Sequence, residues 1–268
     1  MAGDSGAERG AHGVQHSRRR FVAAAGAVTA GAWAAPSIRT VAAAATQSAP
    51  TSVAFFGINQ VTRSLYAVDV STGAWTLIGS TGQTNPLGLA FNPDDGVLYG
   101  CQNNSAPEDA TYTVDTATGT WTLVGAAVNT TGPQGLGYDS STGTMYAVDL
   151  AGIMFTVNLA TGEWTAFGAT GLSGSTAELA YDSTSGVMYG VSRNNLYTVD
   201  LGTGDWTLVG ATGVGQPLGL VHDPVNDEMY GADYPGNTYS VNRATGAYTL
   251  IGASGVGSGC RGMGCVVA

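Results

Sequence analysis

Short hydrophobic runs recur along the chain, and clusters of Gly, Asn, Asp, Ser and Thr separate them. One stretch shows the pattern well, with apolar or aromatic runs at Gly88–Phe91, Val97–Gly100, Tyr112–Asp115 and Trp121–Val124. Runs this short, bounded by turn-forming residues, predict β-strands joined by tight turns. The 41 glycines supply the positive φ values that such turns need, and lysine is absent.

The pattern repeats as a unit. Its five copies are LYAVDVSTGAWTLIG (65–79), TYTVDTATGTWTLVG (111–125), MFTVNLATGEWTAFG (154–168), LYTVDLGTGDWTLVG (196–210) and TYSVNRATGAYTLIG (238–252). The aromatic residue after each Thr-Gly recurs at spacings of 46, 43, 42 and 42 residues. A period in this range with four short strands per unit predicts a β-propeller.

The two ends of the chain carry complementary parts of one repeat. Thr51–Gly57 matches Gly96–Gly100, the second strand of a repeat, whereas Gly262–Cys265 matches the first strand at Gly88–Phe91. We therefore expect an all-β, five-bladed β-propeller over residues 46–268, with four-stranded antiparallel blades. The C-terminal strand should join the N-terminal blade and close the ring, which leaves fewer unpaired strand edges.

A family resemblance points the same way. The segment YTVDLGTGDWTLVG, Tyr197–Gly210, resembles repeats of secreted bacterial β-propellers of uncharacterised function, which are similar to the NHL and YVTN propeller groups. The resemblance covers residues 51–268. It implies the fold and assigns no activity.

The first 45 residues form a separate segment. It contains the motif Ser17-Arg18-Arg19-Arg20-Phe21, then a weakly apolar run to Ala35, and it ends at Ala43-Ala44-Ala45. This pattern resembles a twin-arginine signal peptide cleaved after Ala45. A short membrane anchor is the alternative, but the run is shorter than the ~20 residues that a span requires. We expect a secreted, extracellular or periplasmic protein with no membrane anchor after cleavage.

Charge limits the partners. Without residues 1–45 the chain keeps 4 arginines and 17 acidic residues, a formal net charge of −13. Such a surface repels phosphate backbones and anionic lipids, so nucleic acid is not expected as a partner. A glycan, a small molecule or a protein remains open as a ligand, and we expect a monomer that needs no cofactor.

Three cysteines remain, Cys101, Cys260 and Cys265, so at least one stays unpaired within a monomer. Cys260 precedes the inner strand of the closing blade, and Cys101 ends the second strand of the next one. Antiparallel neighbours place these two positions at the same end of the ring, with Cys265 toward the other end. If a disulfide forms in the exported protein, we expect Cys101–Cys260.

Positions that break the repeat suggest a binding site at one mouth of the central channel, by analogy with other propellers. Glu178 stands where the other copies have glycine, and Gln134 and Arg261 replace Leu or Ala. The loops between second and third strands at this mouth add Asp149, Arg193, Asp233 and Tyr234. For Glu178 and Arg261 the alternative is a structural ion pair or a solvated channel lining.

Enzyme motifs are few. After signal removal His222 is the single histidine, in a strand position where other copies have Phe91, Tyr138 and Tyr181, and we expect it to be packed. One histidine makes no multi-histidine metal site, and we predict none. The leading hypothesis is a non-catalytic binding propeller. The alternative is an extracellular carbohydrate-active hydrolase or lyase that uses Glu178 with Asp149 or Asp233.

Two repeated features also leave alternatives open. The repeated aromatics should pack between blades, or else each stacks on a sugar; they are Trp75, Trp121, Trp164, Trp206 and Tyr248. The acids that begin the Asp-x-x-Thr-Gly turns should bond their own backbone, or else hold calcium. These acids are Asp69, Asp115 and Asp200, and Asn158 and Asn242 take the same place in the other copies.

Overall fold

A computed structural model describes residues 52–104, 109–127, 130–172, 174 and 177–268. The predicted signal peptide, residues 1–45, lies outside these ranges. The described residues form twenty β-strands. Among them, no helix is long and apolar enough to span a membrane.

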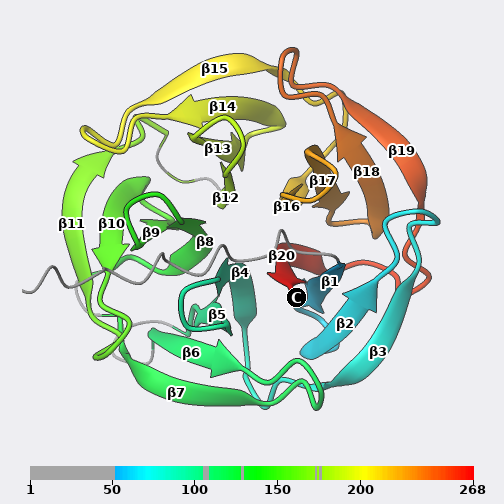
Figure 1. The fold of residues 1–268 in the computed structure, drawn as a ribbon, viewed down its shortest axis with the longest axis horizontal. Coiled ribbons are helices and arrows are strands. Elements are labelled where there is room, and N and C mark those ends of the chain that lie inside the picture. Colours follow the sequence, from blue (N-terminus) through cyan, green and yellow to red (C-terminus); the bar gives the residue numbers. More distant parts are fainter. Residues whose placement is uncertain (1–51, 105–108, 128–129, 173, 175–176) are drawn as a thin grey trace, which may run out of the picture. The chain divides into compact units, whose positions relative to one another are not determined.

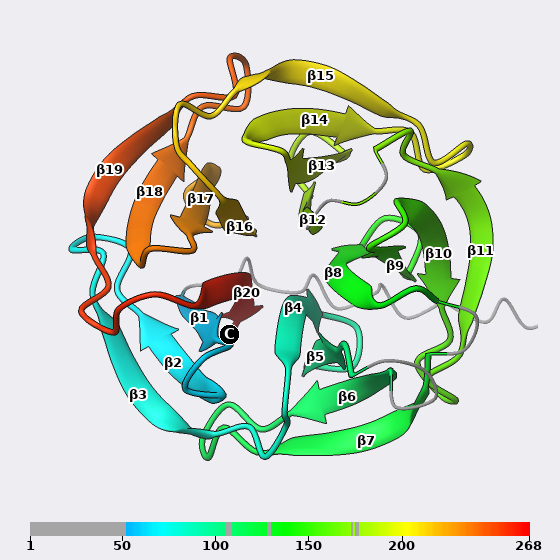
Figure 2. The same ribbon diagram turned by 180° about the vertical axis from the view of Figure 1, so that it is seen from behind.

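The strands form five four-stranded sheets around a central channel (Figures 1 and 2), each antiparallel throughout. From the channel outwards, blade 1 contains β20 (Cys260–Val267), β1 (Val53–Asn59), β2 (Ser64–Val68) and β3 (Trp75–Ser80). Blade 2 contains β4 (Pro86–Asn92), β5 (Val97–Gln102), β6 (Ala110–Val114) and β7 (Trp121–Ala126). Blade 3 contains β8 (Pro133–Asp139), β9 (Thr144–Asp149), β10 (Ile153–Val157) and β11 (Trp164–Ala169). Blade 4 contains β12 (Ala177–Asp182), β13 (Val187–Ser192), β14 (Asn195–Val199) and β15 (Trp206–Ala211). Blade 5 contains β16 (Pro217–Asp223), β17 (Glu228–Asp233), β18 (Asn237–Val241) and β19 (Tyr248–Ala253).

The C-terminal strand closes the ring. β20 pairs antiparallel with β1 from Val53↔Val267 to Asn59↔Cys260, and it lies between β16 and β4, the inner strands of its neighbours (Figure 1). The predicted five-bladed propeller with its exchanged inner strand is therefore confirmed.

The repeated aromatics begin the outer strand of each blade, and their rings pack against the blade's own inner strands. The Trp75 ring lies against Gly57 of its own blade, where an added Cβ would come within 2.4 Å of it, and Trp121 covers Gly100 in the same way. Trp75, Trp121 and Trp164 are buried. Trp75 also donates its indole N–H to Thr238 of the preceding blade. The packing interpretation is confirmed for these three rings, which have no free face for a sugar; Trp206 and Tyr248 are half-buried and lie against Gly190 and Gly231 of their own blades.

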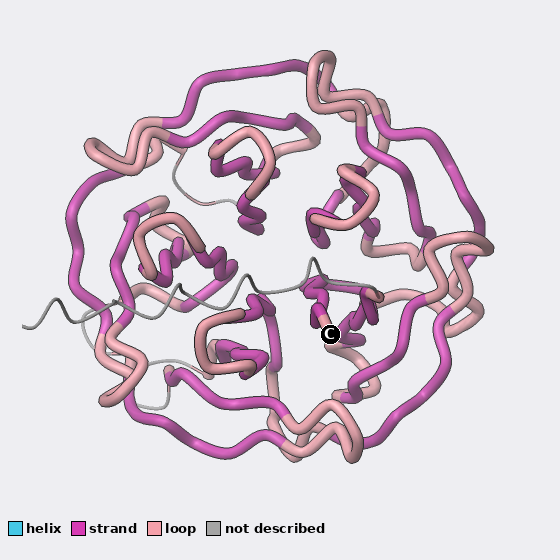
Figure 3. The backbone as a smooth tube through the Cα atoms, viewed as in Figure 1, coloured by secondary structure: helices cyan, strands magenta, loops and turns pink. Residues whose placement is uncertain are grey.

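The Asp-x-x-Thr-Gly turns lie at the outer rim where adjacent blades meet (Figure 3). The Asp69 carboxylate accepts hydrogen bonds from the backbone N–H of Ser71 and the hydroxyl of Thr72, as the turn interpretation predicts. Gly73 has a φ of +82°, and an added Cβ would lie 2.8 Å from the backbone of Gly252 in blade 5. Glycine is thus required both by the turn and by the close approach of two blades.

Candidate functional site

The five inner strands begin on one face of the propeller, called here the start face, and finish on the other, the end face. A pocket of about 250 Å³ occupies the channel toward the end face. Two rings of equivalent positions from all five inner strands line it. The first ring is Leu89, Leu136, Leu179, Leu220 and Met263. The second ring, two residues further along each strand, is Phe91, Tyr138, Tyr181, His222 and Cys265.

Side chains of the second ring link neighbouring blades. The Tyr138 hydroxyl donates to Asp94 of the preceding blade at 2.6 Å, and burial together with this carboxylate raises the pKa of Tyr138. Tyr181 likewise interacts with Asp139 of blade 3. His222 repeats the arrangement, with Nε2 3.2 Å from Oδ1 of Asp182 in blade 4. The rim of the pocket is therefore held by aromatic side chains that reach back to the turn acids of the blade before them.

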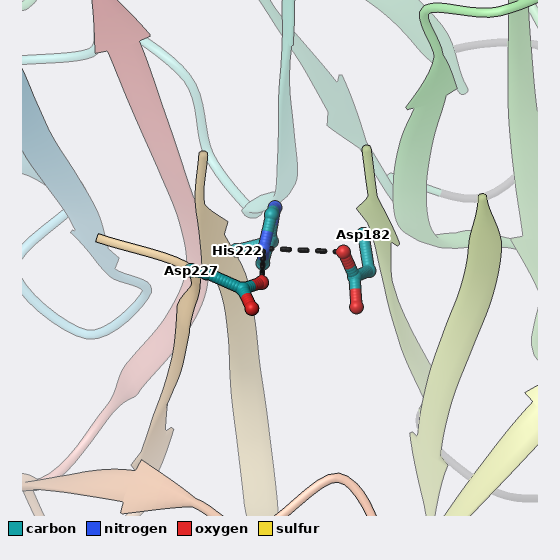
Figure 4. Close-up of side chains that lie close together, drawn as sticks. All are labelled: Asp182, His222 and Asp227. Carbon is teal, nitrogen blue, oxygen red and sulfur yellow. Dashed lines mark hydrogen bonds and ion pairs between the residues drawn. The ribbon is translucent and has the colours of Figure 1, made fainter. Parts of the chain in front are cut away.

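His222 differs from the tyrosines because it meets a second carboxylate (Figure 4). Its Nε2 atom also lies 3.3 Å from Oδ1 of Asp227, on the turn that follows β16. Arg243, from the β18–β19 turn, contacts both Asp182 and Asp227. Hydrogen bonds from Arg243 and His222 lower the pKa of Asp227 to about 2. Burial acts to raise the pKa of Asp182, but hydrogen bonds from Ser185, the charge of His222 and a hydrogen bond from Arg243 hold it below its usual value.

The sequence predicted that His222 is packed, and its side chain is indeed 2 % exposed. The partnership with Asp227 and Arg243 was not predicted. One signal was present in the sequence: Asp227 occupies the turn position where Gly96, Gly143 and Gly186 stand in blades 2 to 4. Asp227 keeps the positive φ of those glycines, +55°, although it carries a side chain.

Three of the predicted site residues meet at the start face. Glu178 and Gln134 are buried there, the Leu136 N–H donates to Glu178 Oε1 at 3.4 Å, and Arg261 donates to Gln134 Oε1 at 3.3 Å. Burial raises the pKa of Glu178 well above its usual value and lowers that of Arg261. Within the described part of the chain no ion pair joins Glu178 to Arg261, and none of the three side chains lines the pocket.

The loop residues of the start face hold their own loops. Asp149 is buried and accepts from the N–H groups of Thr131 and Ile153, at 3.0 and 2.8 Å. Asp233 is buried too, and it accepts hydrogen bonds from the backbone N–H groups of Gly236 and Asn237 and from the Tyr239 hydroxyl. Arg193 is exposed and Tyr234 is half-buried. The binding role proposed for these residues stays a prediction.

The expected Cys101–Cys260 disulfide is not formed, since all three cysteines are free thiols. Cys101 packs in a cluster with Leu136 and Phe155, whereas Cys260 packs with residues of blades 1 and 5. The Cys101 thiol donates to the backbone carbonyl of Gln134, and the Cys260 thiol donates to that of Gly257. Cys265 lies toward the opposite end of β20, as predicted. It lines the pocket and donates to the backbone carbonyl of His222, and burial raises its pKa to about 12.

Comparison of the sequence with known protein families and with curated proteins finds no match. Solved structures share the fold. A chain of the nidogen/laminin complex aligns with a TM-score of 0.58 and 13 % identity over 80 % of this chain and 98 % of that one. A Bacteroides thetaiotaomicron protein of unknown function (TM-score 0.50, 17 % identity, 76 % of this chain) and an auxiliary nutrient binding protein from Bacteroides ovatus (0.50, 16 %, 70 %) also align. This chain spans 58 % and 54 % of the length of these two proteins. At such identities the likeness shows the β-propeller fold.

Proposed function

We propose that this protein is an exported binding propeller and that its ligand occupies the pocket on the end face. The observation that carries the proposal is the pocket itself, which draws the same two strand positions from every blade. Pockets that bind small molecules are concave and mostly apolar, with a few polar groups that orient the ligand. Here the apolar lining includes the leucine and methionine residues of the first ring, whose side chains are packed in the core between blades, while Tyr138, Tyr181 and His222 lie at the rim.

The volume and lining define the class of ligand. About 250 Å³ is small for a ligand site, so a compact molecule, or one side chain or sugar ring of a larger partner, would fill it. The lining carries no Asp, Glu, Lys or Arg, so an uncharged and partly apolar group fits best. Export is supported by the twin-arginine pattern at Arg18–Arg19. Binding also agrees with the nutrient-binding description of the Bacteroides ovatus protein that shares the fold.

The hydrolase alternative has less support. It pairs Glu178 with Asp149 or Asp233, and both aspartates use their oxygens to hold loops. Glu178 is buried on the start face, away from the pocket lining. A glycosidase needs two carboxyl groups that reach the same sugar.

A neutral apolar dye, N-phenyl-1-naphthylamine, tests the proposal, because its fluorescence increases when it leaves water. We expect saturable binding to the full chain. Ser183→Trp, an exposed position on the pocket rim, should weaken dye binding at least tenfold by blocking the mouth. Leu77→Trp, which adds a similar ring on the outer strand β3, should leave binding unchanged. No dye binding, or equal binding by both variants, would place the function elsewhere. A glycan array with the same variants distinguishes a sugar ring from other ligands.

A further inference from the structure

We propose that Asp182, His222 and Asp227 form a binding site for a divalent cation of the zinc class at the rim of the pocket. The site joins blades 4 and 5, since Asp182 ends β12, His222 lies on β16 and Asp227 lies on the following turn (Figure 4). One ligand atom from each residue lies within 4.8 Å of the other two. One imidazole and two carboxylates are ligand types that Zn²⁺ accepts in proteins.

The distances fit coordination. Nε2 of His222 is 3.2 Å from Oδ1 of Asp182 and 3.3 Å from Oδ1 of Asp227. Zn–N and Zn–O bonds are about 2.0–2.2 Å long, so two ligands of a tetrahedral ion lie about 3.3–3.4 Å apart. A single Nε2–H proton, by contrast, points along one direction and cannot make good hydrogen bonds to both oxygens. An ion between the three atoms would contact all of them at once.

Asp227 is an unusual residue for its position. The corresponding turn residues Gly96, Gly143 and Gly186 take a positive φ without strain, whereas Asp227 takes +55° with a side chain. The substitution places a carboxylate beside the one histidine of the ring. Its side chain is 49 % exposed while those of Asp182 and His222 are almost fully buried, so an ion would reach the site from the Asp227 side.

The surroundings suit a ligand set. Asp182 presents Oδ1 to His222, and this oxygen also accepts hydrogen bonds from the backbone N–H groups of Thr184 and Ser185, while its Oδ2 contacts Arg243 and accepts from the Ser185 hydroxyl. Hydrogen bonds to coordinating carboxylates are a usual means of orienting metal ligands. Arg243 balances part of the negative charge of the two carboxylates and donates to Asp227 Oδ1 at 2.9 Å, whereas the contacts of His222 Nε2 are with the two carboxylates. Because His222 also lines the pocket, a bound ion would lie next to the ligand of the proposed function.

Calorimetric titration of the chelator-treated full chain with Zn²⁺ tests the site, with visible absorption of Co²⁺ as a second probe of coordination. We expect one ion bound per chain at this site. Loss of an outer hydrogen-bond partner alone costs metal affinity about 10–100-fold, so loss of a direct ligand should cost at least about 100-fold. Asp227→Gly and His222→Tyr should each show this loss, and both should fold because they restore residues found in the other blades.

Asp94→Asn is the matched control. It alters the equivalent rim contact at Tyr138, which has no histidine, and it should bind Zn²⁺ as the wild type does. Any Zn²⁺ held by His12 or His16 would persist in every variant. Absence of Zn²⁺ binding, or binding that survives both Asp227→Gly and His222→Tyr, would overturn the proposal and leave an ion-pair cluster only. Dye binding by the same variants separates this result from the proposed pocket function.

Discussion

Trp75 of blade 1 donates its indole N–H to the hydroxyl of Thr238 in blade 5 at 3.0 Å, and so ties the closing blade to the blade before it. Trp164 bonds Thr111 of blade 2 in the same way, at 2.9 Å. The equivalent N–H groups of Trp121 and Trp206 are buried without a partner among the described residues. The reason lies in the sequence, because the position that holds Thr238 or Thr111 is Leu65 in blade 1 and Met154 in blade 3.

This difference predicts unequal effects of one substitution. Trp75→Phe removes a buried hydrogen bond and leaves the Thr238 hydroxyl without its donor, whereas Trp121→Phe removes an N–H that has no partner. Trp75→Phe should therefore lower the free energy of unfolding by about 1–3 kcal/mol more than Trp121→Phe does. Urea denaturation of both variants measures the difference. Equal losses would contradict the assigned hydrogen bond.

The C-terminal strand should be essential to folding. Deleting Arg261–Ala268 removes most of β20, leaves one side of β1 unpaired and uncovers apolar surface on two neighbouring blades. Unpaired buried amides cost about 1–3 kcal/mol each against a domain stability of about 5–15 kcal/mol. We expect an insoluble or unfolded product in a thermal melt.

Deletion of Ala268 alone is the control, because this residue follows β20 and makes a single backbone bond, to Ser52. It should melt near the wild type. A soluble protein lacking residues 261–268 with an unchanged melting temperature would contradict ring closure by β20.

The fold was predictable because five copies of one unit show the strands, and because the two ends of the chain carry complementary parts of a blade. The pocket was not. Its lining residues, such as Leu136 and Leu179, are buried core positions of a strand, and only the ring arrangement brings the five inner strands around one channel. The variable polar loops predicted a site at the start face instead. There Asp149 and Asp233 accept hydrogen bonds from the backbone of their own loops.

The His222 cluster shows the same limit. Asp182 ends β12, Asp227 and Arg243 lie on two different turns, and no spacing in the sequence brings the three residues together. The substitution of Asp227 for a glycine was visible, but its meaning depended on where His222 points.

Glu178 should make stability fall as pH rises. Its pKa in the folded protein is raised above the ordinary value of 4.5 because of burial. The folded state then holds a proton that the unfolded chain has lost, so unfolding becomes easier as pH increases above about 4.5. Glu178→Gln mimics the neutral acid and should raise the melting temperature more at pH 8 than at pH 4.

The exposed Glu163→Gln serves as the control and should show no such pH-dependent gain. If Glu178→Gln destabilises the protein at pH 8, the Glu178 carboxylate has a favourable charged partner, and burial does not dominate its pKa.

Export should depend on the arginine pair. Replacing both Arg18 and Arg19 by Lys should retain the precursor in the cytoplasm, because a receptor reads this pair in twin-arginine signals. Replacing Arg39 by Lys, outside the motif, should leave export unchanged. Cell fractionation with an antibody to the mature chain measures both, and undiminished secretion of the double variant would refute the assignment.

The most direct test of the account is a crystal structure of the protein with N-phenyl-1-naphthylamine, or with a ligand found by displacing this dye. We expect electron density in the pocket at the end face, beside the ring of His222 and the half-buried rings of Phe91 and Tyr181. Density at the start face beside Glu178 and Arg261, with the end-face pocket empty, would contradict it.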